Sequence, residues 1–142
     1  MIKIVSRITS TVRSVIREGI KYSVLAIVWA PIIAQAVTLS LYPKYPFAVY
    51  ILILMIGSFL AGYMIEKPKA VVPVWFVSNV LGNISTFACF IFPALSLTGP
   101  EREAVIEAVS SWVVANILHL SRFPIWFLSL LIGLVGSLIG GE

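Results

Sequence analysis

The chain has 142 residues, of which 60% are hydrophobic and 11% are charged, and its formal net charge is +4. A soluble domain of this size is about half apolar and about one quarter charged, and it could not bury this much apolar surface. The composition therefore excludes a soluble globular protein and predicts an all-α, multi-pass integral membrane protein. Half of the basic residues lie in the first 21 positions, which indicates a flank that faces anionic lipid rather than nucleic acid.

Residues 1–21 are predicted to form a basic amphipathic helix, ahead of a transmembrane domain at residues 22–142. At 100° per residue, one face of this helix collects the apolar residues Ile4, Val5, Ile8, Val12, Val15 and Ile16, and the other collects the basic residues Lys3, Arg7, Arg13, Arg17 and Lys21. Such a helix is expected to lie in the membrane interface, against anionic headgroups. The alternatives are a signal peptide with a cleavage site at residues 34–36, an organellar presequence and a solvated charged tail.

Five apolar stretches are predicted to cross the bilayer, at residues 22–41, 47–65, 72–97, 104–120 and 123–140. Pro31 is expected to kink the first of them. A helix start is predicted near Pro100, since Thr98 and Glu101 have the spacing of a capping box. Residues 101–121 are only moderately apolar, so the alternative has four crossings and an interfacial helix in this region.

The distribution of basic residues favours five crossings, with the N-terminus cytoplasmic and the C-terminus outside. In that threading Lys67, Lys69 and Arg122 lie on the same side as the N-terminal basic residues, as the positive-inside rule requires.

A stripe of small and polar residues runs along residues 77–90, inside the third apolar stretch. On a helix its members fall within about 160° of arc, and they are Ser78, Asn79, Gly82, Asn83, Ser85, Thr86 and Cys89. An amide facing hydrocarbon would lose several kcal/mol for each unsatisfied group, so the stripe is predicted to turn away from lipid. It is either a packing seam with hydrogen bonds across helices, or the wall of a polar path along Asn79, Asn83 and Thr86.

Two short segments resemble the small fluoride-channel proteins. Residues 57–62 (GSFLAG) resemble that family's GSFLxG segment, and residues 82–90 (GNISTFACF) are similar to the Gly/Thr/Phe-rich break in its third helix. Phe and Thr residues of that break line the anion path in the family, so the resemblance implies a path along the polar stripe. The chain departs from the family at Leu54, where the family has Asn, and around Ala30 and Pro31, where the family's Gly- and Arg-bearing first helix has no counterpart.

Other candidate positions fall into two groups. Three ionisable or amide side chains inside the fourth stretch are candidates for the polar path or for interhelical contacts, namely Glu107, Asn116 and His119. Small residues at four-residue spacing allow helix backbones to approach closely, which predicts a helix-packing seam made of Gly57, Gly62, Ser129, Gly133, Gly136 and Gly140.

The sequence contains no nucleophile–base pair, phosphate-binding loop or acidic metal cluster, so neither enzymatic activity nor a cofactor is expected. The single cysteine, Cys89, excludes an intrachain disulfide. We therefore expect a non-catalytic structural or accessory subunit of a membrane assembly, whose partners are lipid and other membrane subunits or copies of itself. The alternative is a small homo-oligomeric ion channel or transporter built around the polar stripe.

Overall fold

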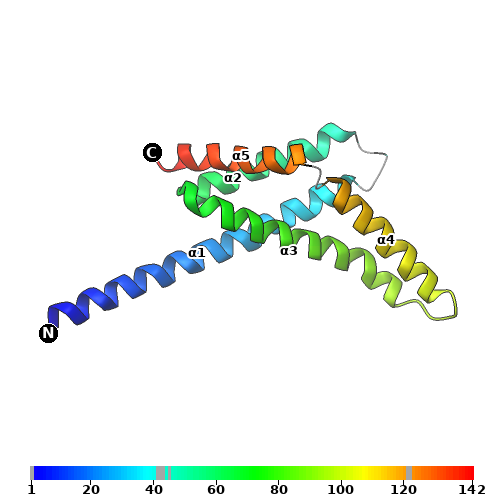
Figure 1. Cartoon of the computed structure of the whole chain (residues 1–142), viewed down its shortest axis with the longest axis horizontal. Helices are drawn as coiled ribbons and strands as arrows, with labels where there is room; N and C mark the ends of the chain where they lie inside the picture. Colours follow the sequence, from blue (N-terminus) through cyan, green and yellow to red (C-terminus); the bar gives the residue numbers. More distant parts are fainter. Residues whose placement is uncertain (1, 41–43, 45, 121–122) are drawn as a thin grey trace.

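The computed structural model describes residues 2–40, 44, 46–120 and 123–142, and these residues form five helices and no strand. The helices are α1 (Ile2–Ser40), α2 (Phe47–Ile65), α3 (Pro68–Leu95), α4 (Arg102–Leu120) and α5 (Phe123–Gly140). Figure 1 shows α2 and α5 lying along each other, α3 crossing α1, and α4 folding back from the end of α3. The all-α prediction is confirmed for the described residues.

Local sequence explains most helix ends. Pro46, whose backbone is extended, precedes α2, and Pro68 occupies the first position of α3, where its missing N–H costs no hydrogen bond. Between these helices Glu66 adopts a left-handed conformation with φ 63°, and its N–H donates to Gly62 O. The helix α4 begins at Arg102, and Val105 N–H donates to Glu101 O. Glu101 therefore lies directly before the helix. The predicted capping box required Glu101 to be the third residue of the helix.

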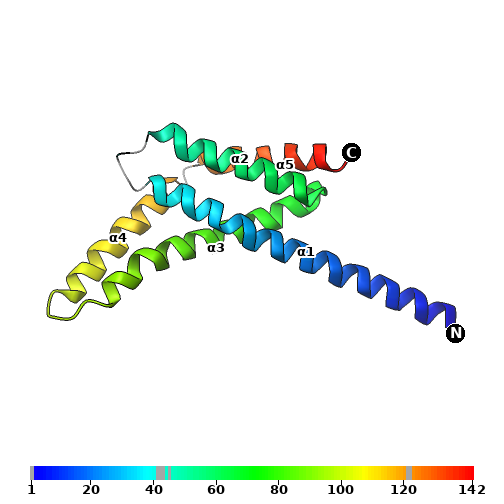
Figure 2. The same ribbon diagram turned by 180° about the vertical axis from the view of Figure 1, so that it is seen from behind.

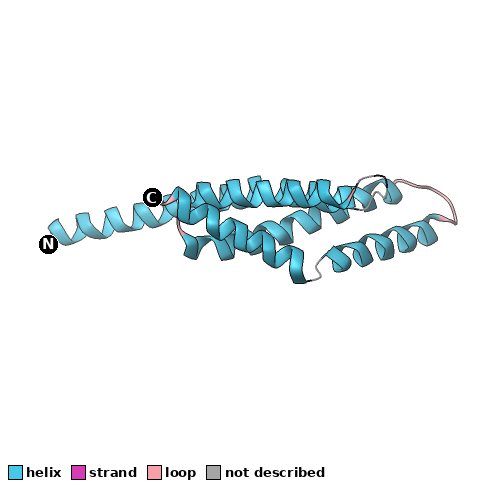
Figure 3. Ribbon diagram, turned by 90° about the horizontal axis from the view of Figure 1, so that it is seen from above, coloured by secondary structure: helices cyan, strands magenta, loops and turns pink. Residues whose placement is uncertain are grey.

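The first helix is continuous across the predicted boundary at residue 21, with Pro31 in its interior. Its 39 residues make a rod of about 58 Å at 1.5 Å per residue. The C-terminal half packs into the bundle, while the N-terminal half projects beyond all other helices (Figures 1 and 3).

The helices α2 and α5 run in the same direction, side by side in both views (Figures 1 and 2). Gly136 contacts Phe59, Gly140 contacts Tyr63 and Gly141 contacts Glu66, so residue numbers rise together along both helices. The C-terminus therefore lies at the same end of the bundle as the α2–α3 turn. The five-crossing threading predicts the opposite, an α5 antiparallel to α2.

Three described helical stretches are long and apolar enough to cross a membrane, namely Thr11–Thr38, Ala48–Ile65 and Pro68–Leu95, and Ile125–Gly140 is a shorter apolar stretch. Large apolar side chains cover the outer faces of these helices, as in Leu52, Phe76 and Ile84. The interior is small and centres on Trp29, Ile33 and Val71. Such a distribution fits a membrane protein, in which the lipid covers the outer faces.

Candidate functional site

The polar stripe of α3 is turned inward, towards α1. Ser78, Asn79 and Thr86 are buried, with exposed fractions of 0%, 4% and 1%. The stripe is narrower than the helical wheel predicts, because Ser85 and Cys89 are exposed.

Close contact between α1 and α3 accounts for this burial. A Cβ added to Gly82 would lie 2.9 Å from Ala30 O and 3.0 Å from the Ile33 side chain. One turn later Thr86 Oγ1 donates to Gly82 O of its own helix at 2.9 Å and also lies 3.4 Å from Ala34 O, a longer polar contact between the two helices. The glycine thus allows the backbones to meet, and the threonine adds a polar contact at the same interface.

Most hydrogen bonds of the stripe stay within α3. Asn79 Nδ2 donates to Trp75 O at 2.8 Å, and Asn83 Nδ2 donates to Asn79 O at 2.9 Å. Ser78 Oγ likewise donates to Val74 O. Each of these three donors therefore bonds to a backbone carbonyl one turn back on its own helix, and no amide bond across helices is found among the described residues.

One atom of the stripe differs from the rest. Asn83 Oδ1 is buried and, within the described part of the chain, has no hydrogen-bond partner. Asn79 lines a separate cavity of about 20 Å³, together with Ile33, Val37, Leu54 and Trp126. A cavity of this size holds about one water molecule. The stripe is thus closely packed, with room for a single water beside Asn79.

Glycines form the interface between α2 and α5. A Cβ on Gly62 would overlap Gly133 O, one on Gly136 would overlap Phe59 O, and one on Gly140 would overlap Tyr63 O. Gly57 belongs to a different contact, since its added Cβ would overlap the Ile32 side chain of α1. The five glycines among the six residues assigned to one seam by spacing therefore serve two interfaces, α2–α5 and α1–α2.

Gly133 also faces the side chains of the core. A Cβ there would lie 3.3 Å from Trp29 Cη2 and 3.4 Å from both Ser58 O and Val71 Cγ1. Trp29 thus reaches from α1 across the bundle to α5. Sequence reasoning missed this residue, because one apolar tryptophan in an apolar helix carries no signal of its orientation.

A tryptophan pair joins α3 to α5. Trp75 Nε1 donates to Ser129 Oγ at 3.0 Å, and the rings of Trp75 and Trp126 meet edge to face with centroids 5.9 Å apart. Ser129 was predicted as a small packing residue, and it is also a hydrogen-bond acceptor. The geometry therefore ties α5 to the bundle by packing against α2 and by a polar bond to α3.

Of the three candidate residues of α4, one has a described side chain. Glu107 is exposed on α4. The side chains of Asn116 and His119 lie outside the described ones, although their backbone belongs to the helix. Among the described residues no group of three His, Cys, Asp or Glu side chains is arranged to hold a metal ion.

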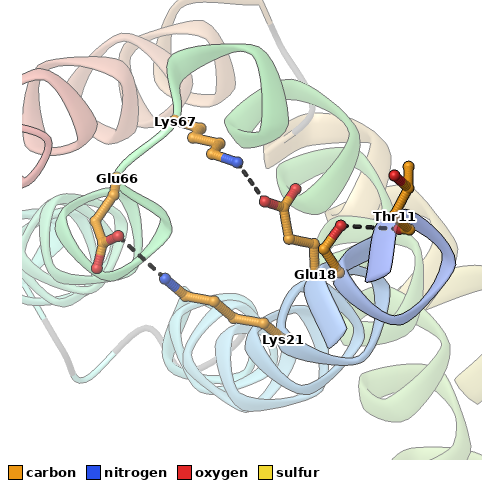
Figure 4. A network of polar contacts seen from close by, with 6 residues as sticks. Thr11, Glu18, Lys21, Glu66 and Lys67 are labelled. Carbon is orange, nitrogen blue, oxygen red and sulfur yellow. Dashed lines mark hydrogen bonds and ion pairs between the residues drawn. The ribbon is translucent and has the colours of Figure 1, made fainter. Parts of the chain in front are cut away.

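Four charged residues tie α1 to the α2–α3 turn (Figure 4). Lys67 Nζ donates to Glu18 Oε1 at 2.6 Å, and Lys21 Nζ lies 3.3 Å from Glu66 Oε2. The hydrogen bond to Glu18 raises the pKa of Lys67 above its ordinary value. These pairs are exposed, so their strength depends on salt.

Comparison of the chain with protein-family models, with curated proteins and with solved structures found no match. The short resemblance to the fluoride-channel proteins implies a break in the third helix. Here α3 continues as an α-helix through residues 82–90.

Proposed function

We propose that the chain is a small multi-pass membrane protein that serves as a non-catalytic structural subunit of a membrane protein assembly. The observation that carries this proposal is the closed α1–α3 interface. The donors of the stripe bond to helix backbones, Gly82 brings the backbones together, and the cavity beside Asn79 has room for about one water. Such an interface suits a scaffold, and no continuous polar path is found among the described residues of the stripe.

The bundle crosses the membrane four times in this proposal, and α4 lies at its periphery. Support comes from the parallel packing of α2 and α5, which puts Gly141 beside Glu66. An even number of crossings must therefore separate these two residues, and α3 and α5 supply them. Because the basic residues of the N-terminal region and of the α2–α3 turn gather at this same end, we place it in the cytoplasm.

The assembly partner is proposed to contact α4. This helix packs on the end of α3, where the rings of Phe90 and Trp112 meet edge to face with centroids 5.8 Å apart. Val114 and Leu118 are exposed one turn apart on α4, with Leu118 64% exposed. Side chains at this spacing form one face of a helix, which suits packing against a further transmembrane helix.

The proposal is tested by native purification in mild detergent with variants of this face. Val114→Ala/Leu118→Ala should dissociate the chain from its partner subunits and leave its own fold unchanged. Leu52→Ala is the matched control, because Leu52 is 59% exposed on α2, away from α4. A chain that purifies only as copies of itself, or equal losses for both variants, would contradict a subunit role.

The second candidate is a homo-oligomeric channel, and the unpartnered Asn83 Oδ1 favours it. An amide oxygen without a partner can replace part of the hydration of a passing ion. Liposomes that contain the purified chain separate the candidates. A current that Asn83→Leu abolishes, with assembly intact, supports the channel, and the absence of current for the wild type supports the structural subunit.

A further inference from the structure

The N-terminal arm is defined as residues 2–17 of α1. No other helix covers the apolar face of its described side chains, which begin at Thr11. All residues from Thr11 to Ile20 are exposed, and Val12, Val15 and Ile16 have exposed fractions of 51%, 64% and 57%. The ion pairs of Glu18 and Lys21 mark the last contacts between this end of α1 and the α2–α3 turn (Figure 4). Beyond them the helix continues alone (Figure 3).

The charge of the arm indicates which kind of partner covers this apolar face. Residues 2–17 contain four basic residues and no acidic one. Arg13 and Arg17 lie about 110° and 150° around the helix from the centre of the apolar face, so both sit on its other side. Two copies of the arm would repel each other, whereas an anionic lipid surface offers apolar chains to one face and phosphates to the other.

The straight helix cannot make this contact. If residues 22–40 cross the membrane, a straight arm, which is about 24 Å long at 1.5 Å per residue, projects away from the membrane with its apolar face in water. Gly19 lies between the arm and the anchored part of α1, and a Cβ added there would meet nothing within 4 Å. Ser23 Oγ donates to Gly19 O, a bond that competes with the helical ladder at this point. Gly19 is therefore a weak point of the helix, placed where the arm joins the anchored part of α1.

We propose that the arm binds an anionic membrane surface by pivoting at Gly19, while the Lys21–Glu66 ion pair holds the part of α1 that follows the pivot against the α2–α3 turn. In the bound position Val12, Val15 and Ile16 face the acyl chains, and Arg13 and Arg17 reach the lipid phosphates. The inference rests on the membrane placement of α1 in the proposed function.

Spin-label accessibility in nanodiscs tests the pivot. Single cysteines are introduced from position 11 to position 20 in a Cys89→Ser background, and their depth is measured from contact with oxygen and with a water-soluble nickel complex. In discs that contain phosphatidylglycerol, depth should oscillate with the helical period, and positions 12, 15 and 16 should be deeper than 13 and 17. In discs of phosphatidylcholine alone, the oscillation should be weaker.

Each other outcome overturns the inference. A steady rise out of the membrane from position 20 to position 11 in both lipids describes a straight arm in water. If label depth oscillates equally in both lipids, the arm binds a protein partner. Spin–spin broadening at positions 12, 15 and 16 would show that the arm binds a second copy of the chain. A label at Ile56, which is exposed on α2, serves as the control for the proposed function. It should lie deep in lipid whatever the arm does, and a shallow position would contradict the proposed membrane placement itself.

Two variants test the charge and the pivot separately. Each basic residue near an anionic surface contributes about fivefold to binding, so Arg13→Gln/Arg17→Gln should lower the ratio of bound to unbound arm about twenty-fivefold. Arg102→Gln, at the start of α4, is the control and should change nothing. Gly19→Ala should lower the ratio about fivefold, because alanine favours the straight helix by that factor. An unchanged ratio for Gly19→Ala would overturn the pivot.

Discussion

Replacing Gly136 with alanine is expected to push α5 away from α2. The added Cβ would overlap Phe59 O, a backbone atom that no change of rotamer can move. Relief of this overlap requires a shift of roughly 1 Å, and a gap of that size forfeits up to half of the dispersion energy of each affected contact. Since packing is a main force between helices in a membrane, we expect a loss of about 1–3 kcal/mol in the free energy of unfolding.

Gly133→Ala, one turn earlier on α5, is the matched control. Its added Cβ would lie 3.3 Å from Trp29 Cη2, the end of a side chain, and 3.4 Å from the nearest backbone atom. A small adjustment accommodates this methyl group, so the expected loss is below about 1 kcal/mol. Equilibrium unfolding in mixed micelles, followed by tryptophan fluorescence, measures both values. Equal losses for the two variants would refute the argument that backbone contact at Gly136 sets the α2–α5 distance.

Three further predictions concern polar contacts. Ser129→Ala should cost about 0.6 kcal/mol, because it removes one hydrogen bond between helices, and Trp75→Phe should cost more, because it also alters the ring contact with Trp126. Added to Trp75→Phe, Ser129→Ala should cost little more, since the hydrogen bond is already absent. The hydrogen bond to Glu18 raises the pKa of Lys67 above its ordinary value of 10.5, so the ion pair stabilises the contact between α1 and the α2–α3 turn below pH 10.5 and is lost as the pH rises through the raised pKa. The distance between spin labels on α1 and on the turn should therefore stay constant up to about pH 9 and increase well above pH 10.5. It should also increase in about 1 M salt, which screens the ion pair. Asn83→Ala should lower the free energy of unfolding by less than about 1 kcal/mol, since its amide bonds only to its own helix, and a larger loss would indicate an interhelical partner.

Helix positions follow closely from the sequence, because apolar length and proline placement determine them. The bounds of α2 and α5 agree with the predicted stretches at residues 47–65 and 123–140. The stretch predicted at 72–97 begins earlier in the structure, at Pro68, because the proline at the first helical position starts the helix directly after the turn.

Helix directions and partners do not follow from the sequence in the same way. The positive-inside rule places Arg122 with the other basic residues only if α4 crosses the membrane, yet α5 packs parallel to α2. A single arginine beside a short loop is a small bias, whereas the glycine contacts from Gly133 to Gly141 extend over about two turns. In the proposed topology packing geometry therefore outweighs the charge rule, and this geometry is not visible in a sequence that offers small residues on several helices.

The candidate site shows a similar division. The wheel puts Ser78, Asn79 and Thr86 on one face of the helix, since periodicity determines the face, and all three side chains are buried. It cannot show that the amides bond to their own helix, because that choice depends on which carbonyls lie within reach after packing. Trp29 was missed for the same reason, since its burial depends on the glycine opposite it.

The central claim of the proposed topology is that the C-terminus lies on the same side of the membrane as the α2–α3 turn. It is tested by single cysteines at positions 69 and 142 in a Cys89→Ser background, labelled from one side with a membrane-impermeant maleimide, and with position 44 as the marker of the opposite side. Lys69, Glu142 and Lys44 are all exposed, so each cysteine is reachable from its own side. The account predicts that positions 69 and 142 label from the cytoplasmic side and position 44 from the other side. Labelling of positions 69 and 142 from opposite sides would contradict the four-crossing arrangement and restore five crossings.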